Sequence, residues 1–235
     1  MSSIFKFKQF DVLQRDSVLK VGTDSMLLGS LIDPGEYETG LDLGAGSGVL
    51  SLMVAQRNKD IHIDAIENHT LTFKECDFNF KSSSFATRLN AIHDDYFEFV
   101  FNKKYDLIFS NPPFYMEDES MMKDSNRLAK HGTIEQFRQL GNRACKQLSK
   151  KGSLWFVLPH DLYLKLVEIN VFKSLYINYI CYIHSKERKL NSRVIVSYSF
   201  HKKVIIENEL VLRNSDNTYT SEYIKLTKDF HYNKL

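Results

Sequence analysis

The 235-residue sequence predicts an α/β protein with an open, doubly wound and mostly parallel β-sheet. From Gly40 onward, short apolar runs alternate with longer segments of helical periodicity, which is typical of βαβ units. No repeat, low-complexity block or Pro/Gly/Ser-rich linker divides the chain. Ligands of such a sheet bind at the carboxyl ends of its strands. The three chemical motifs described below each fall at the end of an expected strand.

Five short apolar runs are expected to form the parallel strands: Leu41–Leu43, Ile61–Ile66, Asn90–His93, Leu107–Ser110 and Ser153–Leu158. The segments around them lack helix breakers or repeat apolar residues every three or four positions, which predicts helices at Val49–Arg57, Thr70–Lys81 and Thr133–Ser149. Beyond Pro159, Tyr176–Ile183 and Val194–Phe200 are rich in β-branched and aromatic residues and flank the polar, basic run Ser185–Ser192. They predict a hairpin-like pair of strands with an exposed basic connection.

Composition limits the class of protein. Three scattered cysteines, Cys76, Cys145 and Cys181, suit a reducing compartment better than a disulfide framework. No apolar stretch is long enough to cross a membrane, and the first residues lack the features of a signal peptide, so a cytoplasmic protein is expected. The eight histidines are dispersed, which predicts no metal site. The net charge of +2 neither supports nor excludes a nucleic-acid partner.

The first motif is a glycine-rich loop between the first expected strand and helix. It contains Gly44, Ala45, Gly46 and Gly48, and its Gly-x-Gly-x-Gly spacing differs from the Gly-x-Gly-x-x-Gly of dinucleotide sites. Glycines let a ligand lie against the main chain. Asp42, just before the loop, places a negative charge where a pyrophosphate is repelled and a cofactor with an ammonium and a sulfonium group is tolerated.

Acidic residues end the next two strands. Glu67 is positioned to accept hydrogen bonds from two ribose hydroxyls, although a solvated carboxylate is the simpler alternative, and Asn68 beside it is expected to line the same site. Asp94 and Asp95 follow the third strand, where a carboxylate can accept from the exocyclic amine of adenine, and Asp95 is favoured. Together these strand ends predict an adenosyl ligand across the sheet edge.

The most specific motif is Asn111-Pro112-Pro113-Phe114 at the end of the fourth strand. The prolines fix the backbone and remove two donors, so the Asn111 side-chain oxygen and the Pro112 carbonyl can accept both protons of one planar amine. The nitrogen lone pair is then directed at a methyl donor, while Phe114 offers a face on which a base can stack. A rigid turn that caps the strand is the structural alternative.

These residues resemble the amino-methylating branch of the class I Rossmann-like methyltransferases, which use S-adenosylmethionine. More narrowly, the chain resembles the bacterial tRNA1(Val) (adenine-37 N6)-methyltransferase family along nearly its full length. The block Lys20–Gly29 and the tail Tyr219–Thr227 carry this resemblance. It implies N6-methylation of adenosine 37, a seven-stranded sheet whose last hairpin strand is antiparallel, and positions for Lys20, Thr23 and Asp24 beside the methionine end of the cofactor.

Thr23 and Asp24 are also expected to cap the helix that they open. The chain is expected to be one methyltransferase domain of three parts: an N-terminal arm and helix (1–35), a cofactor and catalytic core (36–160) and a C-terminal helix and hairpin (161–235). A monomer is favoured. If tRNA is the substrate, the basic residues of the N-terminal arm and of Lys186–Arg193 should lie around the mouth of the site.

Two other hypotheses remain open. The Asn-Pro-Pro-aromatic motif serves planar amides as well as amines, so the acceptor can instead be a protein glutamine or a base of rRNA or DNA. The chain can also be a non-catalytic module that binds S-adenosylmethionine or RNA, although its intact motifs argue against that hypothesis.

Overall fold

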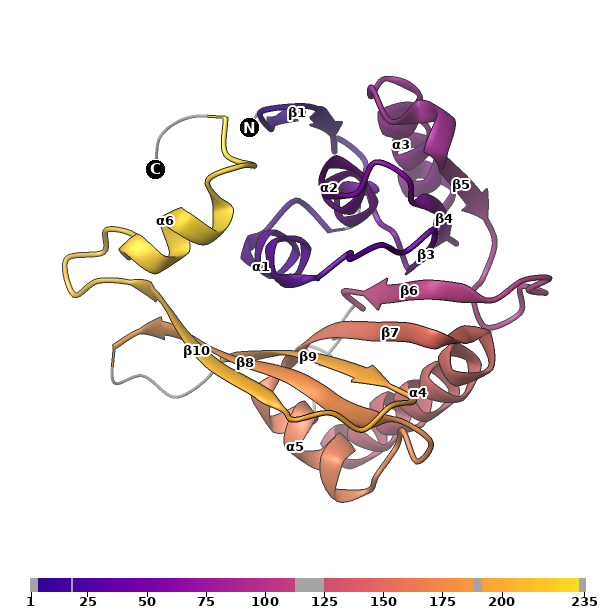
Figure 1. Cartoon of the computed structure of the whole chain (residues 1–235), viewed down its shortest axis with the longest axis vertical. Helices are drawn as coiled ribbons and strands as arrows, with labels where there is room; N and C mark the ends of the chain where they lie inside the picture. The colour runs from indigo at the N-terminus through magenta and orange to yellow at the C-terminus, as the bar shows by residue number, and fades with distance from the viewer. Residues whose placement is uncertain (1–3, 18, 113–124, 188–191, 233–235) are drawn as a thin grey trace.

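A computed structural model describes residues 4–17, 19–112, 125–187 and 192–232, with helices on both faces of one large sheet (Figure 1). Within these residues, eight strands form the sheet in the order β10-β8-β9-β7-β6-β3-β4-β5. The strands are β3 (Thr39–Leu43), β4 (His62–Glu67), β5 (Leu89–His93), β6 (Tyr105–Ser110), β7 (Leu148–Pro159), β8 (Tyr176–Lys186), β9 (Arg193–Ser199) and β10 (Ile206–Arg213).

The first five of these strands in the chain run parallel, and β9 runs antiparallel to both β7 and β8. The doubly wound, mostly parallel sheet and its antiparallel hairpin strand were both expected. The expected total of seven strands is wrong, because β10 adds an eighth strand parallel to β8 at the edge of the sheet. The segment is hard to recognise, since its first four residues are exposed and half of them are charged.

The helices α1 (Thr23–Leu31), α2 (Val49–Arg57) and α3 (Thr70–Lys81) cover one face of the sheet, and α4 (Ser125–Gln147) and α5 (His160–Glu168) cover the other (Figure 1). Two hydrophobic cores result, one on each face. Strand β6 supplies both, since Leu107 and Phe109 join one core while Tyr105 and Ile108 join the other. Burial on both faces explains why the central strands are nearly continuous apolar runs.

The largest differences from the expected boundaries concern one helix and the strand that follows it. The helix predicted to begin at Thr133 begins at Ser125, and β7 begins at Leu148, where that helix was expected to continue. The strand is longer because Leu148 already pairs with Tyr105 of β6. Elsewhere α2 and α3 have the predicted bounds.

The N-terminal arm forms a separate two-stranded antiparallel sheet, β1 (Ile4–Lys6) with β2 (Asp11–Leu13). The buried side chain of Asn79 on α3 ties this arm to the glycine loop: it exchanges two hydrogen bonds with the Leu13 backbone, both at 2.8 Å, and donates to the Ser47 carbonyl at 2.9 Å. The C-terminal helix α6 (Ser221–Thr227) packs against β10 and α1, and a bridge joins Phe7 to His231. Both ends of the described chain therefore lie on the α1–α3 face (Figure 1).

Candidate active site

The sheet brings the three motifs to one edge. Strand β3 lies between β4 and β6, and all three run parallel, so their carboxyl ends are adjacent. The hydroxyl of Ser110, at the end of β6, donates to the Leu43 carbonyl at the end of β3 at 2.6 Å. Glu67, which ends β4, and the residues Gly44 and Asn111, which follow β3 and β6, therefore lie at the sheet edge where the sequence placed the site.

The glycine loop is folded around the end of β4. The amides of Gly44 and Ala45 both donate to the Ile66 carbonyl at 3.0 Å. Gly46 has φ +58°, and a Cβ built on it meets no atom within 4 Å, so the residue keeps open space beside the main chain. Gly48 has φ +81° and approaches α3 so closely that a Cβ would lie 2.5 Å from the Phe80 ring. Gly46 thus leaves room for a ligand, whereas Gly48 packs the loop against a helix.

Glu67 holds the loop in place. One carboxylate oxygen accepts from the Gly46 amide and the other from the His69 amide, each at 2.9 Å. The side chain is 9% exposed, so its remaining lone pairs face a restricted part of the site. Asn68 follows Glu67, and its carbonyl lies 3.1 Å from Nε2 of His93, which stacks on Phe73.

Asp42 lies beneath the loop rather than at its surface. The residue is fully buried; Oδ2 accepts from the Ser51 hydroxyl at 2.7 Å, and Oδ1 has no hydrogen-bond partner in the part of the chain that the structure describes. Burial raises the pKa of this carboxyl to about 7. Asp42 was expected to place a negative charge beside the ligand; it is instead fully buried and, with a pKa of about 7, partly protonated near neutral pH.

Asp94 and Asp95 follow β5 as expected, and Asp95 is the less exposed of the two. Oδ1 of Asp95 accepts from the Phe97 amide at 2.8 Å, which begins a turn. This turn brings in Tyr96, a residue that the sequence analysis missed. Its ring would lie 3.9 Å from a Cβ on Gly44, and burial, together with the charges of Asp95 and Glu67, raises its pKa to about 12. An aromatic residue directly after an expected acidic ligand was the available signal.

Asn111 is oriented by helix α1. Its amide nitrogen Nδ2 donates to the hydroxyl of Ser25, a buried residue in the first turn of α1, at 3.2 Å. The other end of the amide, Oδ1, is thereby turned away from the helix. Pro112 is buried, while Pro113 and Phe114 lie outside the described residues. Ser25 was expected only as a helical residue, and its side-chain role was missed.

The start of α1 differs from the expected cap. The N-cap is Gly22, without a side-chain hydrogen bond, so Thr23 and Asp24 are the first two helical residues. Asp24 instead forms an ion pair of 2.8 Å with Arg193, the first residue of β9. Lys20 donates to the carbonyls of Gln14 and Arg15 and is exposed just before the helix.

The expected basic residues divide between the two sheet edges. Lys186 ends β8 and Arg193 begins β9, opposite Pro159, at the carboxyl edge. By contrast, Lys150 and Lys151 lie near the start of β7, and Lys6 lies over the ring of Tyr232 near the C-terminus. Arg188 and Lys189 lie outside the described residues.

Comparison with known proteins identifies the family to which the chain belongs. The model of the methyltransferase small domain matches residues 17–177. A tRNA1(Val) (adenine(37)-N6)-methyltransferase of Actinobacillus pleuropneumoniae is 35% identical over 230 residues, which cover 97% of each chain. The chain belongs to this methyltransferase family. The expected family and the expected methyltransferase activity are thus confirmed.

Solved structures agree with the fold of the family. A predicted O-methyltransferase from Agrobacterium tumefaciens matches with a TM-score of 0.67 and 16% identity, over 88% of this chain and 96% of that one. The T. thermophilus 16S rRNA N2 G1207 methyltransferase, solved in complex with AdoMet and guanosine, matches with a TM-score of 0.55 and 20% identity, over 82% of this chain and 47% of that one. The α/β class expected from the sequence is confirmed.

The described residues contain neither a candidate metal cluster nor a candidate membrane-spanning helix. Among the described residues, no group of three or more His, Cys, Asp and Glu side chains is arranged to hold a metal ion. None of the helices in that part of the chain combines the length and apolar character that a bilayer span requires.

Proposed function

We propose that this protein transfers the methyl group of S-adenosylmethionine to N6 of an adenine in tRNA, namely adenosine 37 of tRNA1(Val). The observation that carries the proposal is Asn111 at the sheet edge, with Nδ2 bound to Ser25 and Oδ1 therefore left to face the acceptor. The names of the full-length relatives support the choice of tRNA and of position 37.

The residues around the glycine loop fit an adenosyl cofactor. Gly44 and Gly46 leave the main chain open to the ligand, and Glu67 is held in place to accept from the ribose hydroxyls. Asp94 or Asp95 accepts from the exocyclic amine of the adenine, and Asn68 lines the same part of the site. The methionine end is assigned to Lys20, Thr23 and Asp24, which open helix α1 or directly precede it. When bound, the cofactor supplies an electrophilic methyl group on a sulfonium.

Asn111 and Pro112 position the acceptor nitrogen. Oδ1 of Asn111 accepts one N–H of the amine and the Pro112 carbonyl accepts the other, which directs the lone pair toward the methyl carbon. With the cofactor bound, Asn111 and Pro112 would hold the nitrogen for direct transfer of the methyl group from sulfur, and the proton of the methylated nitrogen would pass to water. Fixed orientation of this kind contributes about 7–11 kcal/mol relative to free encounter. Pro113 and Phe114, for which the motif predicts a fixed backbone and a face for the base, lie outside the described residues.

The carboxyl edge also offers charge for a polyanion. Arg15 and Lys20 precede α1. Lys186, the last residue of β8, and Arg193, the first residue of β9, lie at the carboxyl edge. Contacts of lysine and arginine with phosphates release counterions and make binding steeply dependent on salt. A cytoplasmic location, where tRNA is present, is consistent with this substrate.

The direct test is mass spectrometry of nucleosides from unmodified tRNA after incubation with the protein and S-adenosylmethionine. We expect N6-methyladenosine, and nuclease fragments should place it at position 37 of tRNA1(Val). Methyl transfer to rRNA, DNA or protein glutamine in parallel incubations, with none to tRNA, would contradict the substrate. Cofactor binding without methyl transfer to any of them would favour a non-catalytic module.

Charge variants test the binding surface separately. Lys186→Glu at the carboxyl edge should weaken tRNA binding and reduce its salt dependence, while the affinity for S-adenosylmethionine stays unchanged. Lys150→Glu, at the opposite edge, is the matched control and should have little effect. Equal effects of both variants would argue that tRNA does not approach the carboxyl edge.

A further inference from the structure

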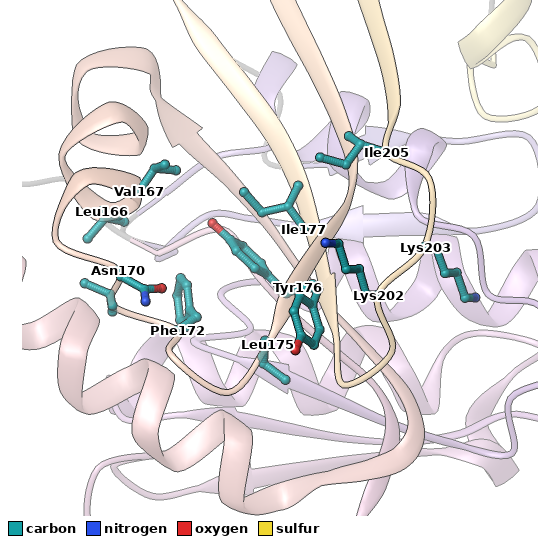
Figure 2. Close-up of a pocket in the computed structure, with 12 residues that line it drawn as sticks. Leu166, Val167, Asn170, Phe172, Leu175, Tyr176, Ile177, Lys202, Lys203 and Ile205 are labelled. Carbon is teal, nitrogen blue, oxygen red and sulfur yellow. The ribbon is translucent and has the colours of Figure 1, made fainter.

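A second surface lies at the other edge of the sheet. There, a groove of about 290 Å³ opens between the end of α5, the start of β8 and the segment before β10 (Figure 2). Ser153, near the amino end of the parallel strands, pairs with Ser199, and Ser199 pairs with Tyr176 of the groove. The groove therefore belongs to the edge opposite the candidate active site, and the methyl-transfer chemistry does not account for it.

The groove is apolar and is flanked by exposed apolar side chains. Val167, Tyr176 and Ile205 line it and are 44–48% exposed, while Val204 and Ile206 beside it are 90% and 59% exposed. Figure 2 shows Ile205 beside Ile177 at one end of this lining. Contiguous exposed apolar side chains are uncommon on a monomer and are typical of an interaction surface.

Charges of opposite sign flank the apolar segment in sequence. Lys202 and Lys203 precede Val204–Ile206, and Glu207 and Glu209 follow it. In the described part of the chain, Lys202, Lys203 and Glu207 take part in no ion pair. Along the chain, two positive residues are followed by three apolar residues and then by a negative one. A second copy that lies antiparallel to the first presents these residues in the reverse order.

A two-fold axis that passes through Ile205 would pair the residues of opposite charge in the two copies. It sets Lys203 of one copy opposite Glu207 of the other and brings Val204 against Ile206, as an isologous interface requires. Strand β10 is the outermost strand of the sheet, and among the described residues its outer side pairs only near its end, where Arg213 meets Tyr219. Free backbone groups along such an edge favour pairing with another chain.

We propose that this face is the interface of a homodimer, in which the Val204–Ile206 segments of the two copies pack against each other beside the apolar groove of each copy. Because the charged and apolar residues of this segment are complementary to the same segment in reverse, the partner that fits the surface is a second copy of this chain. A monomer was favoured from the sequence, and this surface argues against it. Both candidate active sites face away from the interface and remain open to substrate.

The test is the oligomeric state, measured by sedimentation over a range of concentrations. We expect the wild type to dimerise and Val204→Asp to raise the dimer dissociation constant by roughly tenfold or more. Val100→Asp is the matched control, because Val100 is also a highly exposed valine, 76% exposed, but lies in the loop between β5 and β6. It should leave the dimer unchanged, and both variants should keep the wild-type thermal midpoint.

A charge exchange tests the register. Lys203→Glu and Glu207→Lys should each weaken the dimer, because each places like charges opposite one another, and the double variant should restore it. A wild type that stays monomeric at all concentrations would overturn the proposal and leave the groove to another ligand. A dimer that survives Val204→Asp, or a double variant no better than the single ones, would overturn it as well.

Discussion

The glycine loop after β3 and the Asn-Pro segment after β6 lie side by side, but they are held in different ways. The loop is fixed from several directions, by the carbonyl of Ile66, the carboxylate of Glu67 and the packing of Gly48 against α3. Among the described residues, the Asn111 side chain has a single hydrogen-bonding partner, Ser25. The half proposed to bind the cofactor is therefore held by the sheet and α3, whereas the half proposed to bind the acceptor depends on helix α1.

Removal of the acceptor-binding amide should have the largest effect. Asn111→Ala deletes the oxygen that receives one amine proton, and we expect turnover to fall by about 10²–10³, similar to the loss of one oriented hydrogen-bonding group in other active sites. The affinity for S-adenosylmethionine, measured by calorimetry, should change little. Radiolabelled methyl transfer to unmodified tRNA measures the turnover, and wild-type turnover in the variant would remove the basis of the proposed mechanism.

The cofactor half should respond in the opposite way. Glu67→Ala leaves the amides of Gly46 and His69 without their carboxylate partner, and hydrogen bonds to a charged group contribute about 1.5–3 kcal/mol each. We expect the affinity for S-adenosylmethionine to fall by roughly 10–100-fold, whereas turnover at saturating cofactor falls less. Glu67→Gln is the control that keeps one oxygen acceptor, so it should lose less affinity. Calorimetric titration separates the two variants.

Asp42 provides a test of the buried layer beneath the loop. Its pKa is raised to about 7, above the usual value for an unfolded chain, so the folded protein binds the extra proton. The free energy of unfolding should therefore fall as the pH rises from about 4 to about 7, by up to about 1.4 kcal/mol per pH unit from this group. Asp42→Asn should remove that contribution, which urea unfolding at several pH values measures.

The control for Asp42 is a carboxyl whose pKa shifts the other way. Asp64 has a lowered pKa although burial opposes the shift, because Asn90, Lys103 and Tyr105 bind its charged form. Asp64→Asn should therefore remove stability that is present at neutral pH and lost as the pH falls through the lowered pKa. If Asp42→Asn produced the same sign of change, the buried, partly protonated state of Asp42 would be contradicted.

The same contrast explains what could be predicted from the sequence. The parallel strands and the motifs after them follow from apolar runs and strand-end residues, so the position of Asn111 and Glu67 was predictable. The edge strand β10 was missed because its exposed, charged first half lacks an apolar face. The contact of Ser25 with Asn111 and the ion pair of Arg193 with Asp24 were not predicted, because the two members of each pair are 86 and 169 positions apart in the chain. Contacts of this kind depend on tertiary packing, which local sequence patterns do not encode.

Ser25 gives the smallest and most selective effect. Ser25→Ala removes the hydroxyl that accepts from Nδ2 of Asn111, so the amide can rotate and present the wrong end to the acceptor amine. A neutral hydrogen bond contributes about 0.5–1.5 kcal/mol, which corresponds to a loss of turnover of roughly 2–10-fold. The Michaelis constant for the cofactor should not change, since Ser25 acts on the acceptor half alone.

Ser30→Ala is the matched control for this variant. Ser30 lies on the same helix α1 and is buried to a similar degree, but its hydroxyl has no hydrogen-bond partner among the described residues. Its removal should leave turnover and the thermal midpoint close to wild type. If both serine variants lowered turnover equally, the effect would come from the packing of α1. If only Ser25→Ala lowers it, the hydroxyl orients Asn111, and the acceptor half depends on a helix that the glycine loop does not need.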